Sequence, residues 1–145
     1  MKRDKAARFS VVVADDHAPM RRLLCEELSQ RGFEVLGEAA SAREAIAVAL
    51  AAKPDLCLLD INMPGGGLDA ASALSHALPD TSVVMITAVP REDQAEAAAR
   101  AGARGYVAKG ADPDELPEVL RVVATGGAGF ASPWLECLHS AGSSA

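Results

Sequence analysis

The chain has 145 residues, half of them apolar, which suits one domain with a substantial hydrophobic core. Its net charge of −6 argues against direct nucleic-acid binding, which depends on Lys and Arg neutralising phosphates, and its longest apolar runs are too short for a signal peptide or a membrane span. The three cysteines are far apart and show neither a disulfide framework nor a metal-binding spacing, so we expect a soluble protein in a reducing, cytoplasmic compartment.

The first part of the chain alternates apolar runs with helical stripes. Residues 10–14 are predicted to form a strand that ends at two aspartates. The following helix has Pro19 in its first turn, where a missing N–H costs little, and Gly32 as its C-terminal cap. A second strand at residues 34–39 leads into a helix that opens with a capping box at residues 41–44.

The third strand organises the rest of the sequence. Four apolar residues, 56–59, end in Asp60, and Pro64 stops the run shortly afterwards. A continuous apolar run between breakers predicts a strand that is buried on both faces. A carboxylate at the exit of such a strand is poorly explained by packing, so we interpret Asp60 as a nucleophile that accepts a phosphoryl group.

The next elements follow the same alternation. A helix is predicted at residues 68–77 and a strand at residues 83–86. The helix at residues 90–100 has no large apolar side chain between its terminal arginines, and we expect it to be weakly anchored, because packing of an apolar face supplies most helix stability. A short strand at residues 104–108 ends at Lys109.

The last predicted helix begins with Asp112 as its cap and Pro113 at its first position. Pro117 falls one turn further on and removes a backbone hydrogen bond, so this helix should start late or under strain. We assign residues 9–126 to one domain and interpret residues 127–145 as a linker or tail with room for a short helix.

Five strands that alternate with five helices predict a doubly wound, flavodoxin-like α/β fold. We expect a five-stranded parallel sheet of order 2-1-3-4-5 with helices on both faces. Ligands of such sheets bind outside the carboxyl ends of the strands. The polar residues predicted at those ends are Asp15, Asp16, Asp60, Thr87 and Lys109.

The three aspartates follow strands that should be neighbours, so their carboxylates should converge. Converging carboxylates repel one another unless a cation is present. Mg²⁺ is the expected cation, because it binds one or two carboxylates and shares phosphate oxygens. His17 follows the acidic pair, but we favour a helix-start histidine over a ligand, since Mg²⁺ prefers oxygen. Together with Lys109 and Thr87, the set is typical of a phosphoryl-transfer site.

Four segments of the sequence, in this order, resemble the receiver domains of two-component response regulators. They are Val13-Ala14-Asp15-Asp16, Leu58-Leu59-Asp60-Ile61-Asn62-Met63-Pro64, Ile86-Thr87-Ala88 and Gly105-Tyr106-Val107-Ala108-Lys109. Each segment is weak by itself, but the ordered set, with each member at the end of a predicted strand, is highly specific. The resemblance covers about residues 9–126.

This resemblance implies a role for each matched residue. Asp60 would be the phosphoacceptor, with Thr87 hydrogen-bonded to the phosphoryl group and Lys109 paired with it. Tyr106 would be a switch aromatic that turns inward when Thr87 moves toward the phosphate. The Mg²⁺ ligands would be Asp15 (mainly through water), Asp16, Asp60 and the backbone carbonyl of Asn62.

Some features are more specific to one subgroup. Gly110 stands where many receivers have proline, which puts in doubt the cis peptide bond usual at that place. Gly110 and the segments at residues 103–106 and 124–127 look like the LuxR/NarL-type subgroup. We expect that subgroup's helix-turn-helix output domain to be missing, because such a module needs roughly 60 further residues.

The implied function is a phosphorylation-controlled switch. A sensor histidine kinase would supply the phosphoryl group, and the domain would catalyse only its own phosphorylation and dephosphorylation. The surface of the fourth helix, fifth strand and fifth helix would then change and control a partner, a homodimer or an output domain. A small aspartyl-phosphate phosphohydrolase is an alternative, although Asn62 stands where its acid/base carboxylate would be expected. A scaffold receiver that is never phosphorylated is another.

Some of these residues also have plain structural interpretations. Asp60 could be a strand-end turn residue beside Pro64, and Lys109 could be a solvated loop lysine. The two aspartates at 15 and 16 could simply cap a helix, Thr87 could be an ordinary strand end, and Tyr106 could be a packing residue on a short strand.

Overall fold

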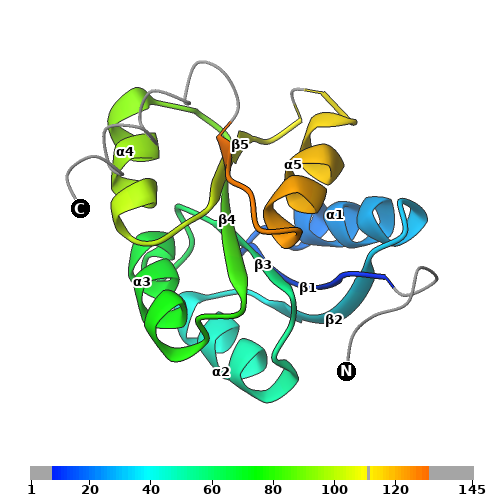
Figure 1. Cartoon of the computed structure of the whole chain (residues 1–145), viewed down its shortest axis with the longest axis horizontal. Helices are drawn as coiled ribbons and strands as arrows, with labels where there is room; N and C mark the ends of the chain where they lie inside the picture. The colour runs from blue at the N-terminus through cyan, green and yellow to red at the C-terminus, as the bar shows by residue number, and fades with distance from the viewer. Residues whose placement is uncertain (1–7, 111, 131–145) are drawn as a thin grey trace.

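A parallel β-sheet runs through the middle of the computed structural model, which describes residues 8–110 and 112–130 (Figure 1). The strands are β1 (Ser10–Ala14), β2 (Glu34–Ala39), β3 (Leu56–Asp60), β4 (Ser82–Thr87), β5 (Gly105–Ala108) and β6 (Gly129–Phe130). The helices are α1 (Ala18–Gln30), α2 (Ala42–Ala52), α3 (Gly67–Ala77), α4 (Glu92–Arg100) and α5 (Glu115–Ala124).

The strands lie in the order β2-β1-β3-β4-β5-β6, and every neighbouring pair is parallel. The predicted order of the first five strands is therefore confirmed. β6 was not predicted, and it pairs Gly129 with Gly105 and Phe130 with Tyr106. A Cβ atom added to Gly105 would lie only 3.1 Å from the carbonyl oxygen of Gly129, so the two strands approach closely where both residues are glycine. The short helix considered for the tail falls on residues 131–145, outside the described residues.

Helices cover both faces of the sheet, as expected. α1 and α5 lie on one face, and α2, α3 and α4 lie on the other (Figure 1). The apolar run of β3 is fully buried, and its side chains alternate between the two cores: Leu56 and Leu58 pack with α1 and α5, whereas Cys57 and Leu59 pack with the opposite helices. Burial on both faces is thus confirmed, and it places the end of β3 at the centre of the sheet's carboxyl edge.

Most predicted helix boundaries agree with the structure. α1 carries its proline in the first turn and ends just before Gly32, whose φ of +93° suits glycine. The hydroxyl of Ser41 accepts a hydrogen bond from the backbone N–H of Glu44 at 3.2 Å, which confirms the N-cap half of the capping box. The Glu44 carboxylate accepts from the N–H of Ala40 at 2.6 Å, one residue before the position that a full capping box uses.

The predicted start of α5 at Asp112 and Pro113 is wrong, whereas the late start expected from Pro117 is confirmed, because the helix begins at Glu115. In a helix that began at Pro113, Pro117 would have to donate a backbone hydrogen bond one turn in, and it has no N–H. With a start at Glu115, Pro117 lies in the first turn, where no intrahelical donor is needed. Asp112 instead forms the preceding turn, where its carboxylate accepts a hydrogen bond from the N–H of Asp114 at 2.9 Å.

α4 has little apolar anchorage. Ala95 and Ala98 are its only buried residues, and both side chains are single methyl groups. This agrees with the expectation from its sequence.

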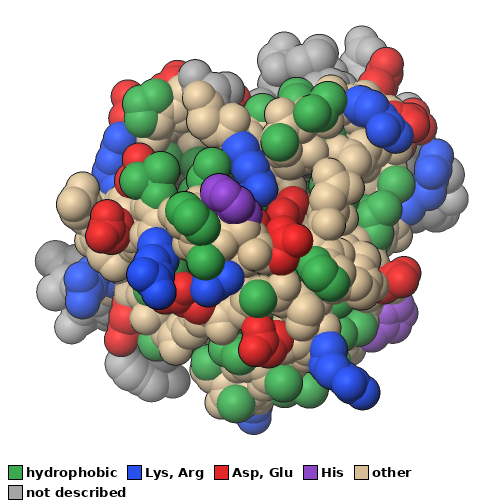
Figure 2. Space-filling view, turned by 180° about the vertical axis from the view of Figure 1, so that it is seen from behind, with side chains coloured by type: hydrophobic (Ala, Val, Ile, Leu, Met, Phe, Trp, Pro, Cys, Tyr) green, Lys and Arg blue, Asp and Glu red, His purple; other side chains and the backbone are tan. Residues whose placement is uncertain are grey.

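The surface is mixed in character. On the face seen in Figure 2, basic side chains are interspersed with acidic and apolar ones. Among the described residues, none of the helices is long and apolar enough to cross a membrane.

Candidate functional site

Three carboxylates gather at the carboxyl ends of β1 and β3. One oxygen from each of Asp15, Asp16 and Asp60 lies within 4.8 Å of the other two. Asp15 and Asp60 are buried, and Asp16 is exposed. Because β1 and β3 are adjacent strands, the fold brings these residues together as the sequence predicted.

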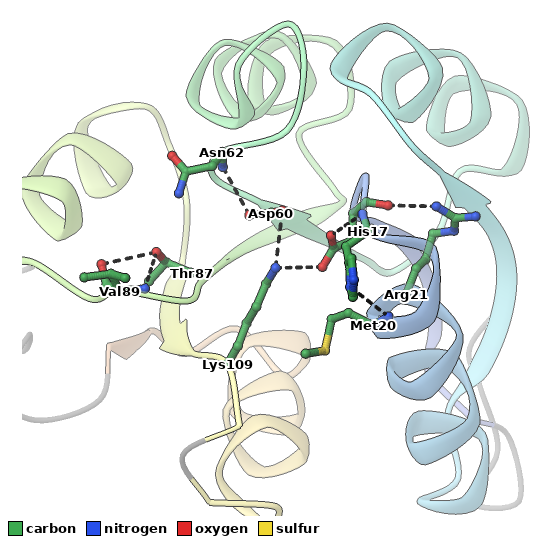
Figure 3. Close-up of polar contacts among 9 residues, drawn as sticks. His17, Met20, Arg21, Asp60, Asn62, Thr87, Val89 and Lys109 are labelled. Carbon is green, nitrogen blue, oxygen red and sulfur yellow. Dashed lines mark hydrogen bonds and ion pairs between the residues drawn. The ribbon is translucent and has the colours of Figure 1, made fainter.

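Lys109 reaches into this cluster from the end of β5 (Figure 3). Its Nζ atom lies 2.8 Å from Oδ2 of Asp15 and 3.3 Å from Oδ2 of Asp60. The Lys109 side chain is only 12% exposed, so the two ion pairs are largely shielded from solvent. The next residue, Gly110, has a φ of +71°, which proline cannot adopt because its ring fixes φ near −65°. The conformation of this loop therefore accounts for glycine at this position.

The electrostatics of the cluster favour a desolvated nucleophile beside a fixed positive charge. Burial raises the pKa of Asp60, and although the Asn62 N–H and Lys109 act against burial, the pKa remains raised. Burial by itself would lower the pKa of Lys109, but the close Asp15 carboxylate and the charge of Asp60 outweigh that effect and raise it. Lys109 is therefore cationic at neutral pH, and Asp60 is a more basic carboxylate than one in water.

Asp15 carries the feature that best fits the binding of a cation. Its Oδ1 atom accepts a hydrogen bond from the N–H of His17 at 2.9 Å. Its Oδ2 atom is buried and close to Lys109, yet it receives no well-oriented hydrogen bond. A buried anionic oxygen with free lone pairs, next to two more carboxylates, fits a hard divalent cation such as Mg²⁺.

The loop after β3 holds Asp60 through backbone contacts. The N–H of Asn62 donates to Oδ1 of Asp60 at 3.1 Å, while the Asn62 side chain is exposed. Gly67 packs directly against the same loop, and a Cβ atom added there would lie 2.7 Å from Cα of Ile61 and nearer still to the backbone oxygen of Asp60. Glycine is thus required where α3 begins.

Thr87 ends β4 one residue beyond Ile86, which pairs with Asp60. Its side chain is buried, and its hydroxyl donates to the carbonyl oxygen of Val89 and accepts from the N–H of Val89, both at 3.3 Å. The hydroxyl is therefore engaged with its own loop (Figure 3).

Tyr106 is fully buried and connects β5 to the start of α4. Its hydroxyl accepts a hydrogen bond from the N–H of Arg91 at 3.0 Å and donates to Oε1 of Gln94 at 2.7 Å. The inward position suits the predicted switch aromatic, although the structure does not test that role. Gln94 was missed in the sequence, because a glutamine in a polar helix carries no signal of a distant partner.

Two further residues complete the surroundings of the acidic pair. His17 is the N-cap of α1, and its Nδ1 atom accepts from the N–H of Met20 at 3.3 Å, as the helix-start interpretation predicted. Arg21 was not predicted to be near the site, yet its guanidinium binds the backbone of Asp15 (Figure 3). It also binds the carboxylate of Glu38. No motif in the sequence signals this contact.

Comparison with known proteins agrees with this geometry. A family model described as the response regulator receiver domain matches residues 11–121. The response regulator GacA of Pseudomonas aeruginosa is 36% identical over 120 residues, which cover 81% of this chain and 56% of that protein. The signal receiver domain of the putative response regulator NarL from Mycobacterium tuberculosis has a TM-score of 0.78 at 32% identity, covering 83% of this chain and 98% of that structure. A LuxR-family two-component response regulator from Aurantimonas sp. has a TM-score of 0.85 at 26% identity, covering 92% of this chain and 97% of that structure.

The chain spans just over half the length of the curated relatives that it matches.

Proposed function

Since the chain belongs to the response regulator receiver domain family, whose members are phosphorylation-dependent signalling domains of two-component systems, we propose that it is a switch with Asp60 as its phosphoacceptor. One observation carries this proposal: a buried Asp60 is ion-paired with Lys109 and faces the carboxylates of Asp15 and Asp16. We propose a sensor histidine kinase as the phosphoryl donor. The chain turns over no substrate beyond its own phosphorylation and dephosphorylation.

The chemistry follows from how the side chains are placed. An oxygen of Asp60 attacks the phosphorus atom, the bond from phosphorus to the donor nitrogen breaks, and an acyl phosphate forms. Lys109, already 3.3 Å from Asp60, pairs with the transferred group. When bound, Mg²⁺ would neutralise charge on the phosphoryl oxygens. The residues proposed to hold it are Asp15, Asp16, Asp60 and the backbone carbonyl of Asn62.

We propose that the phosphoryl group draws the Thr87 hydroxyl away from Val89 and shifts the loop between β4 and α4. That loop runs into Arg91, whose N–H is bonded to Tyr106. A shift at Thr87 therefore disturbs the contact between β5 and α4, and α4 resists little because its fully buried side chains are only two methyl groups. Moving a two-state switch from about 1:99 to about 99:1 takes about 5.5 kcal/mol of differential stabilisation.

The surface formed by α4, β5 and α5 is the proposed output of the switch. A second copy of this chain is one candidate to bind it, and a partner or an output domain is another. This choice of surface is supported by the small number of buried apolar side chains that hold α4 against the sheet.

The two alternative functions, a phosphohydrolase and a scaffold, place different requirements on the residues of the site. A phosphohydrolase would need an acid/base carboxylate where the chain has the exposed Asn62. A scaffold that is never phosphorylated would have no use for a buried, ion-paired Asp60 with a raised pKa. The switch accounts for both features.

The test is phosphorylation by a small acyl phosphate in the presence of Mg²⁺, followed by intact-mass measurement. The unsubstituted chain should gain one phosphoryl group, Asp60→Ala should gain none, and Asp80→Ala should behave like the unsubstituted chain, because Asp80 is an exposed turn residue. No mass increase on the unsubstituted chain would refute the switch and favour the scaffold. Rapid release of phosphate from many donors would favour the phosphohydrolase.

A further inference from the structure

Arg21 links α1, β2 and the loop after β1 (Figure 3). Its Nε atom donates to Oε1 of Glu38 at 2.8 Å, and its Nη1 atom donates to the backbone carbonyl oxygen of Asp15 at 2.8 Å. The Arg21 side chain is 17% exposed, compared with 43% for Glu38. The guanidinium is therefore held inside a fixed arrangement, with Glu38 orienting it from the outer strand.

The carbonyl that Arg21 binds belongs to the peptide unit between Asp15 and Asp16. On the other side of Asp15, its N–H donates to the carbonyl oxygen of Ala39 on β2 at 2.9 Å. Because a peptide unit is planar, a hydrogen bond to the Asp15 carbonyl fixes the plane from which Asp16 departs. Arg21 thus determines the direction in which the chain presents Asp16.

Asp16 depends on this backbone more than Asp15 does. Asp15 is held by the N–H of His17 and by Lys109. The Asp16 side chain is exposed and makes no hydrogen bond or ion pair within the part of the chain that the structure describes. Its place in the carboxylate cluster is therefore set by the preceding peptide, which Arg21 holds.

We propose that Arg21, oriented by Glu38, is a positioning residue that presents Asp16 to the divalent cation. This inference rests on the proposed function, because it presupposes that Mg²⁺ binds at the aspartates. Without Arg21 the peptide between Asp15 and Asp16 loses the hydrogen bond that fixes its carbonyl, and binding of the cation must also restrict its motion.

The test is a Mg²⁺ titration of the full chain, followed by amide resonances or calorimetry, which measures binding without any phosphoryl transfer. Arg21→Met should weaken Mg²⁺ binding about tenfold, the lower end of the range for residues that orient metal ligands. Glu38→Gln should weaken it less, because the bond from Arg21 to Asp15 remains. The Mg²⁺ affinity of Arg21→Lys should lie between those of the unsubstituted chain and Arg21→Met, since an ammonium keeps the charge but lacks the forked guanidinium that binds two acceptors at once.

Arg22→Met is the matched control, because it removes the same charge from the next residue of α1, which is exposed and outside this arrangement. Its Mg²⁺ affinity should stay within about twofold of the unsubstituted chain, as expected for a surface charge. The phosphorylation rate gives a second readout: in Arg21→Met the Mg²⁺ concentration for half-maximal rate should rise, while the rate at saturating Mg²⁺ is retained.

Equal Mg²⁺ affinities for Arg21→Met and Arg22→Met would overturn the inference and leave the proposed function intact. A lower saturating rate with an unchanged Mg²⁺ dependence would also overturn it, since general damage to the fold has that signature. Should Arg21→Met not fold, the Arg21→Lys and Glu38→Gln variants decide, and unchanged affinity in both refutes the positioning role. If the unsubstituted chain binds no Mg²⁺, both proposals fail.

Discussion

Gly67→Ala should damage stability and chemistry together, because this glycine touches the backbone of the phosphoacceptor. An added Cβ atom would lie 2.7 Å from Cα of Ile61 and 3.0 Å from its carbonyl carbon, and nearer still to the backbone oxygen of Asp60. These obstacles are main-chain atoms, so no side-chain rotation relieves the clash. Either the start of α3 or the end of β3 must move.

The expected loss of stability follows from two opposing effects. Overpacking in a tight site costs about 1–3 kcal/mol, and rigid backbone obstacles place this substitution near the upper end. Alanine gains back less than about 1 kcal/mol over glycine here, because the full difference applies to helix interiors and Gly67 is the first residue of α3. The net loss is about 2 kcal/mol, which for a domain of this size lowers the melting temperature by about 4–8 °C.

Thermal unfolding followed by circular dichroism measures the first effect, and the rate of phosphorylation by a small acyl phosphate measures the second. Gly32→Ala is the matched control: it strains a residue at a φ of +93° but meets no atom within 4 Å. It should lower stability without slowing phosphorylation of the folded protein, whereas Gly67→Ala should slow it. A Gly67→Ala variant with an unchanged melting temperature, or with the same phosphorylation rate as Gly32→Ala, would refute the reasoning.

Three other predictions follow from the described contacts. Because its pKa is raised, Asp60 binds its proton more tightly in the folded state, so its ionisation removes stability as the pH rises above the ordinary pKa of 3.8. Asp60→Asn should therefore have a higher melting temperature than the unsubstituted chain at neutral pH without Mg²⁺, and the difference should disappear below pH 3.8. Equal melting temperatures at neutral pH would contradict this. Tyr106→Phe should lose about 1 kcal/mol, because the partly buried N–H of Arg91 and the amide oxygen of Gln94 lose their partner. Amide exchange at Arg91 should accelerate, and unchanged exchange there would show that the hydroxyl does not hold α4. Burial raises the pKa of Cys57 to about 12, so iodoacetamide at pH 8 should leave it unmodified until the protein is unfolded, and rapid native labelling in a peptide map would show that β3 opens.

The sequence predicted best where one local pattern determines the structure. The apolar run of β3 is continuous and ends in Asp60, so both its burial and the position of its carboxylate could be predicted. The convergence of the three aspartates then followed from strand order alone, because parallel strands deliver their ends to the same side of a sheet.

The failures involve distant partners or conflicting local signals. Asp112 and Pro113 resemble a helix start, but Pro117 lacks the N–H that such a start would require, and the helix begins later. Gly129 lies in a glycine-rich segment with low strand propensity, and it pairs only because α5 returns the chain alongside β5. Arg21 and Gln94 act through partners far away in sequence or in another element, which periodicity and spacing do not reveal.

The two-residue strand β6 also limits how this domain can meet other molecules. By pairing with Gly105 and Tyr106 it takes up hydrogen-bonding groups on the outer side of β5. The opposite margin, β2, presents the exposed glutamates Glu34 and Glu38, and charged margins of this kind oppose the addition of another strand. A peptide that tried to lengthen the sheet would have to displace β6 or pair against these acidic side chains. Addition of a strand is therefore opposed both at β2 and at the part of β5 that β6 covers.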